Sequence, residues 1–148
     1  MKIEKPTLYE GLKKIKDLNI INENIDNDSI LGTFSYNDLI FTFLDRMDNG
    51  KDYNIFVISL ELEFDFPKKG KKTDEFKKDF EKYFKSEISS IAGVSSSYKI
   101  NRDSVKINML SITPYINVIS NSEMLITPII NIMYFLHLDL YRFFLDEV

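Results

Sequence analysis

The sequence predicts a two-layer α+β domain, in which helices pack on an antiparallel sheet of about five strands. Residues 73–91 carry apolar side chains at helical spacing, and residues 54–66 alternate apolar and polar side chains with a period of two. Asn/Asp/Gly turns separate further strand-like runs, and runs of hairpins beside amphipathic helices are typical of α+β domains. The chain has 148 residues, 44% of them apolar and 28% charged, so we treat 1–148 as a single domain.

The N-terminal segment predicts a short amphipathic helix over residues 7–18. Thr7 and Glu10 form a capping box, and apolar residues then recur at every third or fourth position. Residues 20–29 are rich in Asn and Asp but lack the Gly and Glu positions of a calcium-binding EF-hand loop. We therefore expect a solvated turn there.

The third of the predicted strands is the clearest element of the chain. The even positions of residues 54–66 are apolar after the first, while the odd positions begin with Ile55 and Val57 and then turn acidic. An outer strand face that begins apolar predicts that something covers it. An Asp-Asn-Gly turn at residues 48–50 predicts the hairpin that leads into this strand. The three strands are predicted over residues 30–35, 39–44 and 54–66.

The second half of the chain predicts a helix, a hairpin and a closing helix. A basic loop at residues 68–72 precedes the helix, and Pro114 is expected to end the second strand of the hairpin. The closing helix begins with a capping box at Ser120 and Glu123 and contains Pro128, which either kinks the helix or begins it. These elements are predicted over residues 73–91, 98–101, 104–112 and 120–148.

The closing helix is the most apolar run of the chain, and its length alone would let it span a bilayer. It also contains Asp139 and Arg142, and each such charge costs a few kcal/mol at the centre of a membrane. We therefore expect a helix packed on the domain, without a membrane partner. The absence of cysteine, and an N-terminus without the apolar core of a signal peptide, lead us to expect a cytoplasmic protein.

The composition disfavours several classes of function. A net charge of −4 argues against a nucleic-acid partner, and a chain without cysteine has no thiolate metal site and no cysteine nucleophile. His137 lies between two leucines, with Asp139 on a different helix face, so a histidine beside the core is a better interpretation than a general base. There is no phosphate-binding loop and no dinucleotide fingerprint. We expect no catalytic residues, no cofactor and no metal.

The order α-β-β-β-α-β-β-α, together with the length and the acidity, resembles the type III secretion chaperone-like fold. Class I effector chaperones and a bacterial sensory-transduction regulator family share that fold. The resemblance rests on residues 7–18, 54–66, 73–91 and 98–112 and on the closing helix. It implies a bacterial protein without catalytic residues. The first helix and strand are rich in Ile, Asn and Phe, where secretion chaperones are rich in Leu and Gly.

The function we expect is therefore binding of another protein, by a non-enzymatic and homodimeric module. The chain is 14% aromatic, more than the core of one small domain requires. Two alternatives stay open. One is a small inhibitor or immunity protein, encoded by a phage or a toxin locus, that blocks a basic site. The other is a metal-dependent enzyme that uses Glu61, Glu63 and Asp65, which lie about 7 Å apart along one strand face. The partner-binding candidates are Ile55, Val57, Tyr134, Phe135, Tyr141, Phe143 and Phe144.

Overall fold

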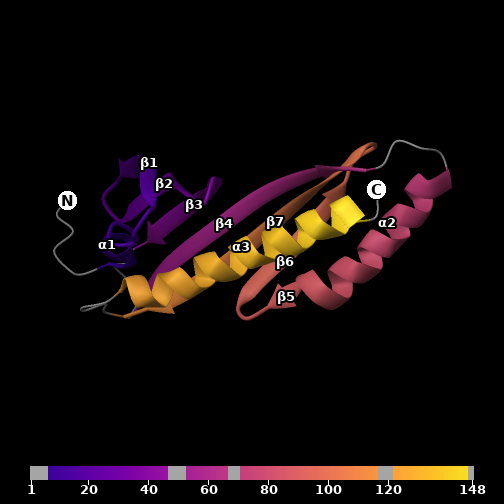
Figure 1. The fold of residues 1–148 in the computed structure, drawn as a ribbon. Helices are drawn as coiled ribbons and strands as arrows, with labels where there is room; N and C mark the ends of the chain where they lie inside the picture. The colour runs from indigo at the N-terminus through magenta and orange to yellow at the C-terminus, as the bar shows by residue number, and fades with distance from the viewer. Residues whose placement is uncertain (1–6, 47–52, 67–70, 117–121, 147–148) are drawn as a thin grey trace.

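The computed structural model describes residues 7–46, 53–66, 71–116 and 122–146. It confirms the α+β class, since the described residues form one antiparallel sheet with helices packed on it (Figure 1). The elements in chain order are α1 (Leu8–Leu12), β1 (Asn19–Ile25), β2 (Ser29–Tyr36), β3 (Leu39–Arg46), β4 (Asn54–Asp65), α2 (Lys71–Tyr83), the π-helical turn η1 (Phe84–Ile88), β5 (Ser90–Ile91), β6 (Val94–Ile100), β7 (Ser104–Tyr115) and α3 (Glu123–Asp146).

The sheet has seven strands in the order β1-β2-β3-β4-β7-β6-β5 within the described part of the chain. Its centre is the long antiparallel pair β4 and β7, which stay in register from Asn54 opposite Tyr115 to Asp65 opposite Ser104. The strand β6, followed by the short β5, flanks this pair on one side, and the meander β1–β2–β3 flanks it on the other. The prediction of about five strands was therefore two strands short.

The two additional strands lie where the sequence shows no strand periodicity. The predicted turn at residues 20–29 overlaps all of β1 but its first residue, and β1 is an edge strand that pairs with β2 and exposes nearly every side chain. A strand with neither face buried needs no apolar alternation, so its sequence reads as a polar loop. The other addition, β5, is only two residues long.

The first helix is shorter than predicted. The N-cap was correct, because the Thr7 hydroxyl accepts a hydrogen bond from the Glu10 backbone N–H at 3.3 Å. The α-helix ends at Leu12, however, and tighter turns carry the chain on, with the N–H of Ile15 donating to the carbonyl of Leu12. These turns keep Ile15 buried, so the apolar spacing is that of a helix although the helix has ended.

The hairpin that follows α2 also differs from the prediction at its ends. The helical region ends at η1, and the chain then reverses through Ala92 and Gly93, both with positive φ. The strand predicted to begin at residue 98 begins at Val94, so the serine-rich residues 95–97 belong to β6. β7 continues through Pro114, where the sequence predicted its end. On its β6 side, β7 is paired only as far as Leu110, so a proline at position 114, which has no N–H, loses no hydrogen bond to β6.

In α3, Pro128 lies inside a helix that begins at Glu123, so this proline does not start the helix. The expected cap at Ser120, the turn at residues 48–50 and most of the basic loop, residues 68–70, lie outside the described residues. The predicted helix start at Thr73 is two residues late, since α2 begins at Lys71.

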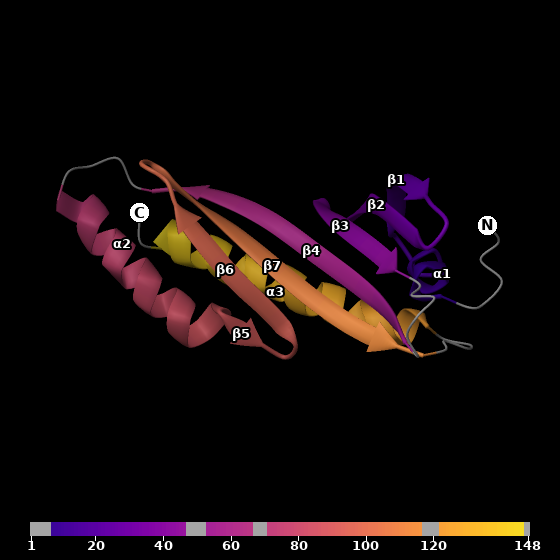
Figure 2. The ribbon, with the colours of Figure 1, turned by 180° about the vertical axis from the view of Figure 1, so that it is seen from behind.

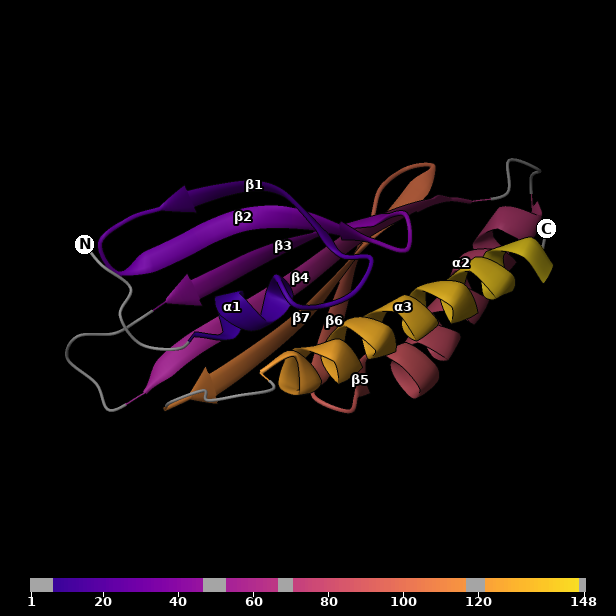
Figure 3. The same cartoon turned by 60° about the vertical axis from the view of Figure 1, so that its left-hand side comes forward.

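All three α-helices lie on the same side of the sheet (Figure 3). Their buried side chains meet the inner side chains of the strands in a single core, which is rich in phenylalanine near the C-terminal end of α3. From behind, the strands β4, β7 and β6 are seen with no helix in front of them (Figure 2). We call this uncovered side of the sheet the open face.

Candidate functional site

The open face carries a row of four apolar side chains that crosses four neighbouring strands. Leu31 of β2 lies opposite Leu44 of β3, Leu44 opposite Val57 of β4, and Val57 opposite Ile112 of β7. Leu31 is 49% exposed and Ile112 is 58% exposed, while the two central residues are half-buried between their neighbours. We call these four residues the apolar row.

The strict alternation of β4 places this row on the open face. Phe56, Ile58 and Leu60 point into the core and are fully buried, so Ile55, Val57 and Ser59 must point the other way. Ile55 is half-buried and lies beside the apolar row, opposite Pro114. The structure thus brings the two predicted strand candidates together on one uncovered surface.

Farther along β4, the open face becomes charged but does not have a single sign. Glu61, Glu63 and Asp65 are exposed there, as the alternation predicts. Glu63 lies opposite Lys106 of β7, and Lys106 lies opposite Lys99 of β6. The described residues contain no group of three or more acidic or histidine side chains that could hold a metal ion.

The helical candidates divide between the surface and the core. Phe135 is 60% exposed and Tyr141 is also exposed, whereas Tyr134 and Phe143 are half-buried. Phe143 stacks on Tyr83 with the ring centroids 4.5 Å apart. Phe144, only 6% exposed, stacks on Phe64 of β4 at 4.6 Å and belongs to the core. Of these candidates, Phe135 and Tyr141 are therefore accessible at the surface and Phe144 is not.

His137 is placed as a helix-surface histidine with little scope for catalysis. It is half-buried between the rings of Tyr134 and Tyr141, and its Nδ1 is enclosed without a hydrogen-bond partner. Burial lowers the pKa of this imidazole. The nearby Asp139 pairs instead with Arg142, at 3.8 Å, so it does not orient the imidazole as a general base would require.

By length and composition, the segment Glu123–Leu145 could cross a membrane, and 28% of its most apolar window is buried in the protein. Its inner side, with Ile126, Ile130, Met133 and Leu140, packs against the sheet. A core helix of a soluble protein passes the same test of length and composition. The cytoplasmic location therefore stays a prediction.

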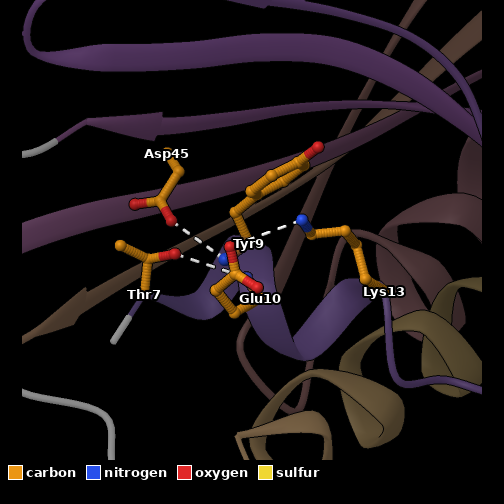
Figure 4. Close-up of polar contacts among 5 residues, drawn as sticks. All are labelled: Thr7, Tyr9, Glu10, Lys13 and Asp45. Atoms are coloured by element: carbon orange, nitrogen blue, oxygen red, sulfur yellow. Dashed lines mark hydrogen bonds and ion pairs between the residues drawn. The ribbon is translucent and has the colours of Figure 1, made fainter. Parts of the chain in front are cut away.

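A buried carboxylate that the sequence analysis missed fastens α1 to the sheet. Asp45, on the core side of β3, is 0% exposed, and its Oδ2 accepts a hydrogen bond from the backbone N–H of Tyr9 at 3.0 Å (Figure 4). Its Oδ1 accepts from the hydroxyl of Tyr115 at 2.5 Å. The backbone of Leu8 and the side chain of Asn54 also lie near the Tyr115 hydroxyl and act to lower its pKa.

The electrostatics of this cluster follow from its burial. Loss of solvent raises the pKa of Asp45 to about 6, and the hydrogen bond from Tyr115 opposes that rise. Burial and the neighbouring carboxylate together raise the pKa of Tyr115, so its hydroxyl stays protonated and acts as a donor. The polar groups of the cluster are closed off from solvent, and we assign the cluster a structural role. The alternation of Phe41, Phe43 and Asp45 on one side of β3 is the signal by which the sequence could have placed this aspartate in the core, but the predicted strand ended at residue 44.

A shallow pocket of about 440 Å³ lies between β6 and the end of α2. Serine hydroxyls dominate its polar lining, and the Oγ of Ser96 is enclosed without a hydrogen-bond partner. His137, the only histidine of the chain, is not among its lining residues, so the ionisable side chains beside these hydroxyls are Glu81 and Lys85. The lining residues are Glu81, Phe84, Lys85, Ser89, Ser96, Ser97 and Tyr98.

Taken together, the fold and its surfaces define a two-layer α+β domain with one helix-covered face and one open face that is partly apolar. In comparisons with known proteins, no family model, no curated protein and no solved structure matched the chain. The resemblance to the type III secretion chaperone-like fold stays a prediction.

Proposed function

We propose that this protein is a non-catalytic, homodimeric module that binds protein through the apolar part of its open face. The observation that carries the proposal is the apolar row, which no helix of the described chain covers. Monomeric proteins rarely leave contiguous apolar surface of this kind in water, and such patches mark binding sites. The exposed side of α3, with Phe135 and Tyr141, offers a second apolar surface on the other side of the sheet.

Two features of the site support binding in preference to catalysis. The carboxylates of Glu61 and Glu63 line an exposed, mixed-charge surface and not a cleft. The imidazole of His137 lacks an orienting carboxylate. An acid–base mechanism needs a base held within hydrogen-bond reach of a substrate proton, and neither group is placed in that way.

Light scattering after size exclusion at micromolar concentration, with an apolar-surface dye in parallel, tests the proposal. We expect twice the chain mass of 17.4 kDa. An Ile112→Lys variant should weaken association, because it puts a charge into the apolar row. Ile25→Lys is the matched control, since Ile25 is also about half exposed (53%) but sits on the helix side of edge strand β1, opposite buried Ile30. A monomer that binds no dye would contradict the proposal.

A further inference from the structure

We propose that a second copy of this chain packs on the open face about a two-fold axis that runs parallel to the strands, between β4 and β7. The inference rests on the proposed function and names the occupant of that surface. It follows from the pairing of β4 with β7 and from the chemistry of the side chains that each strand turns outward.

The axis converts neighbours within one chain into contacts between two chains. A two-fold rotation about a line between β4 and β7 lays β4 of one copy over β7 of the other. Each outward residue of β4 has a partner opposite it on β7 of its own chain. In the dimer, the same β4 residue also faces the copy of that partner in the second chain. Two sheets packed face to face lie about 10 Å apart with their strands roughly aligned, so the residues nearest the axis meet most directly.

The apolar contacts produced by this axis are complementary. Val57 faces Ile112 of the second copy, and Ile112 faces Val57 of the second copy, so each contact occurs twice. Ile55 meets Pro114 in the same way. The contacts bury Val57 and Ile112, the half of the apolar row that lies on β4 and β7, and removing this apolar surface from water favours association.

The charges are complementary as well. Glu63 lies opposite Lys106 in the sheet and would therefore face Lys106 of the second copy, again twice per dimer. Lys106 is exposed and makes no ion pair with any described residue, so its ammonium group is available. Glu61 would face the neutral side chain of Asn108. No like charges meet along β4 and β7.

Other arrangements fit less well. A two-fold axis across the strands at Val57 would turn one end of the open face onto the other, so that Ser59 faces Ile55 and Glu63 is moved away from Lys106 of the second copy. On the exposed side of α3, the charges of Asp139 and Arg142 already pair within the chain. The sheet surface is thus the one on which a second copy supplies the missing opposite charges.

The test reverses the charge of one member of the proposed contact between Glu63 and Lys106. Glu63→Lys places two lysines at positions 63 and 106, and Lys106→Glu places two glutamates there, so each variant alone brings like charges together twice. We expect each to weaken the dimer by about tenfold or more. An equimolar mixture of the two should form a heterodimer of near wild-type affinity, because every contact is again between opposite charges. Glu75→Lys, the same change at an exposed position of α2, is the control and should leave the affinity unchanged.

Analytical ultracentrifugation measures the affinities, with circular dichroism to show that each variant is folded. The mixture is decisive, because both variants disturb the cross-strand pair within their own chain and only a contact between chains can restore binding. A wild-type dimer that tolerates both variants, or a mixture that fails to associate, overturns this axis while leaving the proposed function standing. A wild-type monomer that still binds dye overturns the second copy as the occupant and the homodimeric part of the proposed function, and leaves the apolar binding surface standing. A monomer that binds no dye overturns the proposed function itself.

Discussion

Replacing Asp45 by asparagine should make the stability of the protein less dependent on pH. The carboxyl group is fully buried, and its two oxygens accept hydrogen bonds from the Tyr9 N–H and the Tyr115 hydroxyl. An asparagine of the same shape can still accept from Tyr9 but can no longer ionise. The variant therefore isolates the cost of a buried negative charge from the rest of the cluster.

The sign and the size of the effect follow from the pKa of Asp45, which is about 6 in the folded protein against an ordinary value of 3.8. Because the folded pKa is raised, the contribution of this group to stability is fully present below the unfolded pKa and is lost as the pH rises through the folded pKa. The shift of roughly two units corresponds to about 3 kcal/mol once the group is fully ionised. Between about pH 4.5 and pH 7.5, the wild-type protein should lose about 2 kcal/mol through this group.

Urea denaturation of both proteins at these two pH values measures the difference. The pH-dependent change in the free energy of unfolding should differ between wild type and Asp45→Asn by about 2 kcal/mol, with the wild type losing more on going to the higher pH. Asp38→Asn, at an exposed turn between β2 and β3, controls for removal of a surface carboxyl. Equal pH dependence in wild type and Asp45→Asn would refute the assignment of a costly buried charge.

Three further predictions, which use four substitutions, probe the same structure. Phe144→Ala should lower the free energy of unfolding in urea by about 3–5 kcal/mol, because it leaves a cavity in the aromatic core. Phe135→Ala, on the exposed side of the same helix, should change that free energy by no more than about 0.5 kcal/mol. Similar costs for the two variants would contradict the placement of α3. Gly11→Ala should destabilise by about 1–3 kcal/mol, since the added Cβ would lie 2.9 Å from the backbone N of Glu123 at the start of α3; a neutral result would mean that α1 and α3 do not meet there. Tyr115→Phe removes a donor from the buried carboxylate, so the pH at which the group's contribution to stability is lost should move upward; an unchanged profile would argue against the hydrogen bond.

The elements with one buried and one exposed face could be predicted from the sequence. The alternation of residues 54–66 defined β4 almost to the residue, because Phe56, Ile58 and Leu60 must share one side for a core to form. The N-cap of α1 was also readable, since the hydroxyl of Thr7 acts within one turn of chain. Helix capping and burial of one face of an element both depend on residues close together in the chain, so both can be recognised in the sequence.

The edge of the sheet could not be predicted, because its stability comes from elsewhere in the chain. β1 exposes almost every side chain and depends on its hydrogen bonds to β2, which any residue type with a backbone N–H can make. The close fit around Gly32 is part of the same pairing, since a Cβ there would meet the backbone of Asn22 and Glu23 and the ring of Phe43. In the sequence, a glycine inside a run of strand-like residues makes the prediction of a strand weaker. In the structure, Gly32 lets β1 and β2 approach each other closely.

The candidate site was half predictable for a similar reason. Ile55 and Val57 were identified from the strand that carries them, but nothing in the sequence joins Val57 to Leu44 and Ile112, which come from strands elsewhere in the chain. Register decides which outward side chains become neighbours, and register is set by the core. In α3, too, composition marked the aromatic surplus but could not tell that Phe144 turns inward and Phe135 outward.

The dependence of the open face on register links the proposed dimer to the fold itself. The core residues Phe56, Ile58 and Leu60 hold β4 against β7, and a slip of one residue would turn them outward and bury Val57. The same register that closes the core thus places Val57 beside Ile112 and Glu63 beside Lys106. Because the proposed axis repeats each of these pairs between two copies, complementarity within the sheet becomes complementarity between sheets. A surface of this kind needs no residues beyond those that already pair the two central strands.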